Sequence, residues 1–99
     1  MKLKGYQRQY LRAKAHHLKP KIVIGKKYIS DGVLNAIREV FHSEELIKIK
    51  LPDTKEKNKY ISIISSSINC AVVGSIGKVL IAYKEFPEKE LQKIKLPNK

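Results

Sequence analysis

Apolar residues recur with helical spacing near the start of the chain. Within residues 4–18, Leu11, Ala15 and Leu18 lie on one side of a helix, because they are three or four positions apart. Pro20 cannot continue a helix and disfavours helical geometry in the residue before it. The pattern therefore predicts a first helix over residues 4–18 that ends before the proline.

Two further helices are predicted downstream. Ser30 is a favourable N-cap for a helix over residues 30–42, whose apolar side consists of Val33, Leu34, Ile37, Val40 and Phe41. Residues 54–69 also fit a helix, with an apolar face made of Tyr60, Ile61, Ile64 and Ile68. Residues 60–64 could instead form a strand, but a helix of this length suits a crossover between two parallel strands.

Four short segments have the pattern of β-strands. Residues 21–25 are rich in β-branched side chains, and residues 46–51 alternate so that their two lysines point away from the apolar side. Residues 70–73 and 78–84 flank a turn at 74–77 and are expected to form a hairpin. The order α-β-α-β-α-β-β predicts the α/β class, as a compact sandwich with a four-stranded mixed sheet.

The length of the chain sets its organisation. Residues 1–99 are enough for a single domain with one modest core, and residues 85–99 are expected to form a C-terminal tail. The single cysteine, Cys70, cannot form an internal disulfide, which favours a reducing compartment. No apolar run approaches the roughly 20 residues of a membrane span, and the N-terminus lacks the apolar core of a signal peptide. We therefore expect a cytoplasmic protein without a membrane partner.

The charge of the chain is strongly positive and uneven. There are 21 Lys and Arg residues against 9 Asp and Glu residues, a net charge of +12. Residues 1–30 contain nine of the basic residues and no acid. Self-repulsion of this size disfavours a compact state, so the charge indicates a polyanionic partner, with nucleic acid favoured. A charge that only keeps the protein soluble is the alternative.

Two basic segments are candidates for contacting nucleic acid. Four cations share one face of the predicted first helix: Lys4, Arg8, Arg12 and Lys19. An ordinary solvated face usually mixes charges of both signs, whereas no acid occurs here. The loop after the first strand contains two cations and an aromatic ring that can stack on a base: Lys26, Lys27 and Tyr28. A surface turn with a packed tyrosine explains this loop equally well.

A turn with two glycines is the sharpest motif of the chain. Gly74-Ser75-Ile76-Gly77 is followed directly by Lys78. Two glycines keep Cβ atoms away from the backbone, so that its N–H groups can approach a phosphate. A Gly-X-X-Gly loop clamps the nucleic-acid backbone in this way in KH domains. An ordinary hairpin turn with two glycines is the alternative.

The sequence lacks the residue arrangements that are typical of catalytic and metal-binding sites. His16, His17 and His42 do not have the spacing of metal ligands, and Cys70 has no second sulfur to act with it. The carboxylates are scattered, and Gly-Ser-Ile-Gly-Lys lacks the spacing of a Walker loop. We therefore expect no enzyme activity, no metal, no cofactor and no small-molecule substrate.

Several motifs occur in order along nearly the whole chain. They are Leu18-Lys19-Pro20 with Gly25-Lys26, Ile29-Ser30-x-Gly32-Val33, Leu46-Ile47-Lys48-Ile49-Lys50, Val73-Gly74-Ser75-Ile76-Gly77-Lys78 with Tyr83-Lys84, and Ile94-x-Leu96-Pro97. In this order they resemble the CRM domain family, also called YhbY-like. The chain departs from the family at Tyr28, where a glycine is usual, and at Lys84, where an arginine with bidentate phosphate geometry is usual.

The resemblance implies both a fold and a function. The fold would be similar to the C-terminal domain of translation initiation factor three. The function would be RNA binding, to which the Gly-X-X-Gly loop contributes. Free-standing bacterial and archaeal members are associated with precursors of the large ribosomal subunit, whereas plant organelle members act in group II intron splicing.

Residues and resemblance together predict a sequence-tolerant binder of structured RNA, with ribosomal RNA or a pre-ribosomal particle as its partner. The expected RNA contacts are Lys4, Arg8, Arg12, Lys19, Lys26, Lys27, Tyr28, Gly74, Ser75, Ile76, Gly77 and Lys78. A DNA-binding protein is one alternative, disfavoured because the helix over 30–42 offers few basic side chains to a groove. An adaptor that binds an acidic ribosomal or assembly protein is the other.

Overall fold

Seven helices and strands follow one another in the predicted order. In the computed structural model, which describes residues 2–98, they are α1 (Gly5–Ala15), β1 (Pro20–Val23), α2 (Asp31–Ser43), β2 (Leu46–Lys50), α3 (Lys57–Ile68), β3 (Ala71–Ile76) and β4 (Val79–Tyr83). A short 3-10 helix, η1 (Lys89–Leu91), lies in the segment after β4. The prediction of an α/β fold is therefore confirmed, and so is the choice of a helix for α3.

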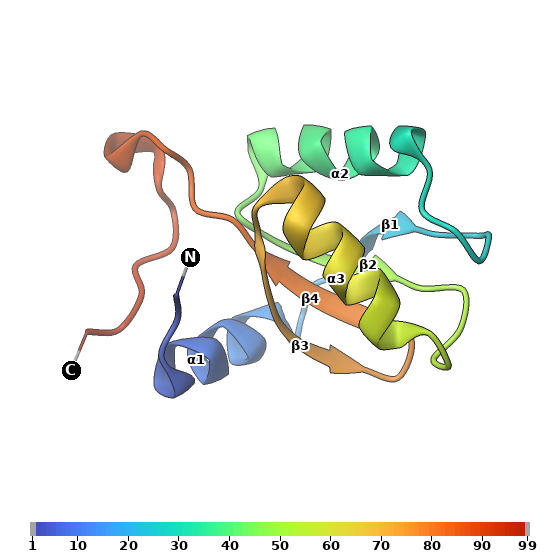
Figure 1. Ribbon diagram of the computed structural model, residues 1–99. Coiled ribbons are helices and arrows are strands. Elements are labelled where there is room, and N and C mark those ends of the chain that lie inside the picture. Colours follow the sequence, from blue (N-terminus) through green and yellow to red (C-terminus); the bar gives the residue numbers. More distant parts are fainter. Residues whose placement is uncertain (1, 99) are drawn as a thin grey trace.

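The four strands form one mixed sheet with the order β1-β2-β4-β3. β1 pairs with β2 in parallel, while β4 lies antiparallel to both β2 and β3. β1, β2 and β3 therefore run in the same direction, and the segments that follow them lie at the same end of the sheet. These segments are the β1–α2 loop, the β2–α3 loop and the β3–β4 turn (Figure 1).

Helices cover the two faces of the sheet unequally. α2 and α3 lie side by side over one face (Figure 1). Their buried side chains are Leu34, Ile37, Phe41, Tyr60, Ile64 and Ile68, which pack with Ile47, Ile49, Leu80 and Ala82 of the sheet. α1 packs alone on the other face, where Leu11 and Ala15 contact Leu46, Val73, Ile81 and Tyr83. Among the described residues, no helix has the length and apolar character needed to cross a membrane.

The first helix is shorter than predicted. It ends at Ala15, and the N–H of Leu18 donates to the carbonyl of Ala15 (3.0 Å) in a tight turn. As a consequence Lys19 lies in the α1–β1 linker, and the prediction that it shares a helix face with Arg12 is wrong.

The glycine turn is also shorter than predicted. Gly74, Ser75 and Ile76 belong to β3, because they continue the ladder with β4, and only Gly77 and Lys78 form the turn. Gly77 has a φ of 56°, as the first central residue of a two-residue hairpin turn often does. The register of β3 against β4 shifts between Val72 and Gly74, so that Val73 forms a β-bulge.

The segment after β4 returns to α1 and is held by one carboxylate. Glu45 is buried, and its two oxygens accept the backbone N–H groups of Phe86 (2.9 Å), Lys93 (2.7 Å) and Ile94 (3.1 Å). The side chain of Gln7 in α1 donates to the carbonyl of Pro97 (3.2 Å). These contacts place residues 93–97 against α1, whereas residues 85–91 lie beside α2 and the end of α3.

Candidate nucleic-acid interface

Two arginines attach α1 to β3. The guanidinium of Arg8 donates to the carbonyl of Val72 (2.8 Å), and that of Arg12 donates to the carbonyl of Val73 (2.9 Å). Both acceptors lie at the bulge of an edge strand, where carbonyl groups lack a neighbouring strand. The two arginines predicted to bind phosphate therefore also have a structural role, in which they are held in place beside the glycine motif.

Gly74 lies directly beneath Arg12. A Cβ atom on Gly74 would come within 2.5 Å of Cδ and 3.1 Å of Cγ of Arg12. The missing side chain thus allows the arginine to lie flat against the strand. The basic face of α1 and the glycine motif form one surface.

Two lysines continue this surface around the hairpin turn. The N–H of Leu51 donates to the carbonyl of Lys78 (2.7 Å), which fixes the turn to the end of β2. The ammonium of Lys57 in α3 donates to Oγ of Ser75 (3.3 Å). Lys78 itself is exposed. Cations from α1, α3 and the turn therefore lie around the motif.

The β1–α2 loop is held at the same end of the sheet, two strands away from the hairpin turn. The hydroxyl of Tyr60, with its single proton, lies within hydrogen-bond distance of two acceptors, the carboxylate of Asp53 (3.2 Å) and the carbonyl of Lys27 (3.5 Å). The Glu56 N–H, which donates to Asp53, contributes most to lowering the pKa of that carboxyl. Tyr28 is 65% exposed and does not have a positive φ, so the loop does not require a glycine there.

The remaining predicted contacts are more scattered. Lys4 is the N-cap residue of α1, and its backbone N–H donates to the side chain of Gln7 (2.9 Å). It lies one helical turn before Arg8, farther from the hairpin turn than Arg8 and Arg12. Lys19 and Lys26 are exposed, the first in the α1–β1 linker and the second in the β1–α2 loop. The structure thus groups Arg8, Arg12 and residues 74–78 closely, and places Lys4 away from them.

Acidic residues are absent from every element that builds the α1 side of the sheet. α1, β1, β2, β3 and β4 contain no Asp or Glu. The nine acids occur in α2, in the loops and in the segment after β4. The positive field is therefore concentrated on the face that carries Arg12 and the glycine motif.

Sequence reasoning missed three lysines of this region. Lys48 and Lys50 were expected to be the solvent side of a strand, and they do lie on the face opposite α2 and α3. The ammonium of Lys48 donates to the carbonyl of His16 (3.4 Å). The alternation of residues 46–51 predicted on which face of the sheet these two lysines lie. It could not show how much of that face α1 covers. Lys57 carried no signal, because its contact with Ser75 is made across the fold.

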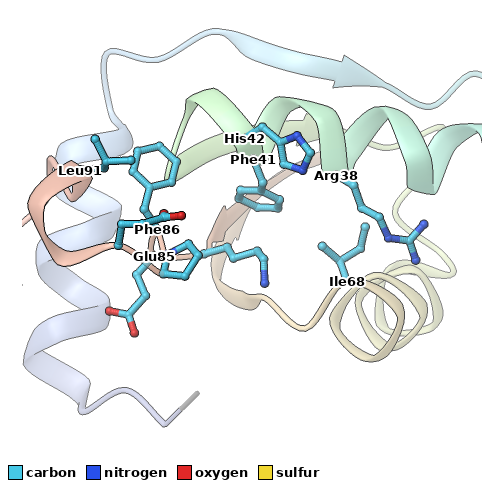
Figure 2. A pocket seen from close by; sticks show the side chains of 10 residues that line it. Arg38, Phe41, His42, Ile68, Glu85, Phe86 and Leu91 are labelled. Carbon is cyan, nitrogen blue, oxygen red and sulfur yellow. The ribbon is translucent and has the colours of Figure 1, made fainter.

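A separate pocket of about 620 Å³ lies at the opposite end of β4. Figure 2 shows Phe41 and Ile68 on one side of it and Phe86 and Leu91 on the other. Arg38 at its rim is engaged with the Asn35 side chain (2.9 Å) and the Ser67 carbonyl (3.0 Å). Within residues 2–98 no group of three His, Cys, Asp or Glu side chains could hold a metal ion. The pocket combines apolar side chains with the ionisable side chains of Arg38, His42, Lys84, Glu85 and Glu88.

Comparison with known proteins identifies close relatives. The "Probable RNA-binding protein YqeI" of Bacillus subtilis is 34% identical over 97 residues, which cover 96% of this chain and 99% of the relative. An "RNA-binding protein" of Haemophilus influenzae is 37% identical over 95 residues, with 94% and 93% of the two chains covered. Neither name is that of an enzyme, in agreement with the expectation that the chain has no catalytic activity.

A solved structure and a family model agree with this relationship. The solution structure of SAV1595 from Staphylococcus aureus matches 97% of this chain and 100% of its own, with a TM-score of 0.83 and 30% sequence identity. The model of the CRS1/YhbY (CRM) domain matches residues 3–84, which include all four strands and the glycine motif. This chain belongs to the CRS1/YhbY (CRM) domain family.

Proposed function

We propose that this protein binds structured RNA in the cytoplasm, and that its partner is ribosomal RNA in a precursor of the large ribosomal subunit. The names of its relatives support RNA as the ligand. The resemblance to free-standing CRM proteins supports the ribosomal partner. A CRM domain over residues 3–84 would act by binding the RNA.

One observation carries the proposal: Arg12 lies against Gly74, on the side of the sheet where α1 and the strands contain no acid. Phosphates are attracted to such a surface because the elements that form it carry cations and no carboxylates. Arg8 and Arg12 each use part of the guanidinium for a strand carbonyl, which leaves other N–H groups for a phosphate. The exposed Lys78 would supply a further charge beside the turn.

The ribosomal partner is tested in cells that express the tagged protein. Ultraviolet crosslinking, followed by sequencing of the bound RNA, is expected to enrich segments of the large-subunit RNA and its precursor. The Arg12→Ala/Lys78→Ala double variant should lose most of this enrichment. Crosslinks spread over messenger and transfer RNA in proportion to their abundance would contradict the ribosomal partner.

The adaptor and DNA alternatives are tested with purified protein. Replacement of Gly74 and Gly77 by valine should weaken RNA binding and leave the binding of an acidic protein intact, provided that the domain stays folded.

The DNA alternative is tested by competition. Unlabelled structured RNA should displace labelled RNA at lower concentration than duplex DNA of the same length. α2 offers a groove little charge, because Arg38 is the single Lys or Arg residue in this helix.

A further inference from the structure

On the α1 side, the part of the sheet nearest the hairpin turn carries exposed apolar side chains. Four neighbouring positions, one from each strand, form a row at the end nearest the hairpin turn: Val23, Lys50, Val79 and Ile76. We call these four residues the open row. Val23 is 66% exposed and Ile76 is 64% exposed, although both are apolar and lie in strands. The neighbouring row, which contains Gly74 and Ile81, is already covered by Arg12 and α1.

The open row combines apolar contact area with positive charge. Lys50 lies within it, Lys48 lies two residues before on the same face, and Lys78 lies in the adjoining turn. All five elements around it are free of acids. Strands are about 4.8 Å apart, so the row is about 14 Å wide. A surface of aliphatic side chains beside Lys48, Lys50 and Lys78 is complementary to a ligand with apolar faces and a polyanionic backbone.

We propose that the open row is a platform for unpaired nucleotides, so that the protein prefers single-stranded segments of RNA over fully paired duplex. This inference rests on the proposed RNA-binding function and specifies the class of RNA. Bases would lie over Val23, Val79 and Ile76, while their phosphates contact Lys48, Lys50 and Lys78. Four-stranded sheets of other RNA-binding modules hold two or three bases in a comparable way, with aromatic side chains.

A duplex cannot use this platform for a geometric reason. The base faces of a duplex are stacked on one another, and only base edges are accessible in its grooves. The deep, narrow major groove of A-form RNA cannot admit the flat face of a sheet. A duplex would therefore contact the cations without covering the aliphatic side chains.

The test compares two RNAs with one double variant. The RNAs are a labelled 12-nucleotide single strand of mixed sequence and the same strand annealed to its complement. Val23→Ser/Ile76→Ser should bind the single strand about 10-fold more weakly and the duplex unchanged, because it loses apolar contact but no charge. Leu91→Ser is the matched control, since Leu91 is 57% exposed but lines the pocket of Figure 2.

The outcomes separate this inference from the proposed function. If the wild type binds both RNAs with equal affinity, or the double variant keeps full single-strand affinity, RNA binding stands and the platform is wrong. If the wild type binds neither RNA at low salt, the proposed function falls and the platform falls with it. The wild type could instead be a dimer and the double variant a monomer with the same RNA affinity. This result would assign the open row to contact between two copies and overturn the platform. Val23→Thr/Ile76→Thr, which retains β-branching, replaces the serine variant if that variant unfolds, and should show the same selective loss.

Discussion

Arg12 shows how a single side chain connects the helix, the bulge and the glycine motif. Its guanidinium donates to the carbonyl of Val73, while its aliphatic part occupies the space that a side chain at position 74 would need. Gly74 is therefore needed for close approach, whereas Gly77 is needed for its positive φ. The two glycines of one motif have different physical roles.

The contact between Gly74 and Arg12 can be measured as a coupling energy. Gly74→Ala should lower the free energy of unfolding by about 1 kcal/mol, because the new Cβ displaces Arg12 from the strand. In an Arg12→Ala background the same change should cost almost nothing. Chemical denaturation of the wild type, the two single variants and the double variant gives the cost of Gly74→Ala in each background. Gly25→Ala is the control, since its Cβ would meet nothing within 4 Å, and equal costs in both backgrounds would refute the contact.

Three buried groups, Cys70, Tyr60 and Tyr83, have raised pKa values and make the free energy of unfolding depend on pH in the alkaline range. Burial raises the pKa of the Cys70 thiol to about 11 and that of the Tyr83 hydroxyl to about 12. Between pH 9 and 11 the unfolded chain therefore binds fewer protons than the folded protein, and stability falls as pH rises. Urea unfolding should show this decline beginning near pH 9. Cys70→Ala should delay it until tyrosine ionises near pH 10, and a flat wild-type profile through this range would contradict the assignment.

At the scale of elements, the periodic segments were the predictable ones. α2 and α3 carry a complete apolar face in sequence, and the structure buries Leu34, Ile37, Tyr60 and Ile64 as the spacing indicates. The ends of elements were less predictable, because they depend on partners across the fold. β3 extends through Gly74 only because β4 continues to pair with it, and α1 stops at Ala15 as the chain turns towards β1.

Glu45 controls the position of the last segment. Glu45→Gln should release residues 85–98, because the amide offers one acceptor oxygen and places an NH₂ group among backbone donors. The expected loss of unfolding free energy is about 1–3 kcal/mol. Hydrogen exchange should show faster exchange at Phe86, Lys93 and Ile94, and the exposed control Glu88→Gln should leave these amides protected. Unchanged protection in Glu45→Gln would mean that apolar packing alone holds the segment.

At the scale of the whole molecule, the sequence indicated the amount of charge and its uneven distribution along the chain. It could not indicate that α1 and β2 bring their cations to one side of the sheet while α2, the loops and the last segment carry the acids. Lys50 illustrates the difference. The alternation of Lys50 with Ile49 predicted the face of the sheet on which Lys50 lies. Only the position of α1 in the structure shows that the helix leaves Lys50 uncovered.

We expect RNA to bind the α1 side of the sheet, and the salt dependence of binding tests this expectation most directly. The affinity for the 12-nucleotide single strand is measured by fluorescence anisotropy over a range of salt concentrations. Lys50→Ala/Lys78→Ala should lower the slope of log affinity against log salt by about 1.4, the value for two lost phosphate contacts on a single strand. Lys59→Ala/Lys89→Ala removes the same charge from exposed positions in α3 and η1 and should leave the slope unchanged. Equal slopes for the two double variants would contradict the account.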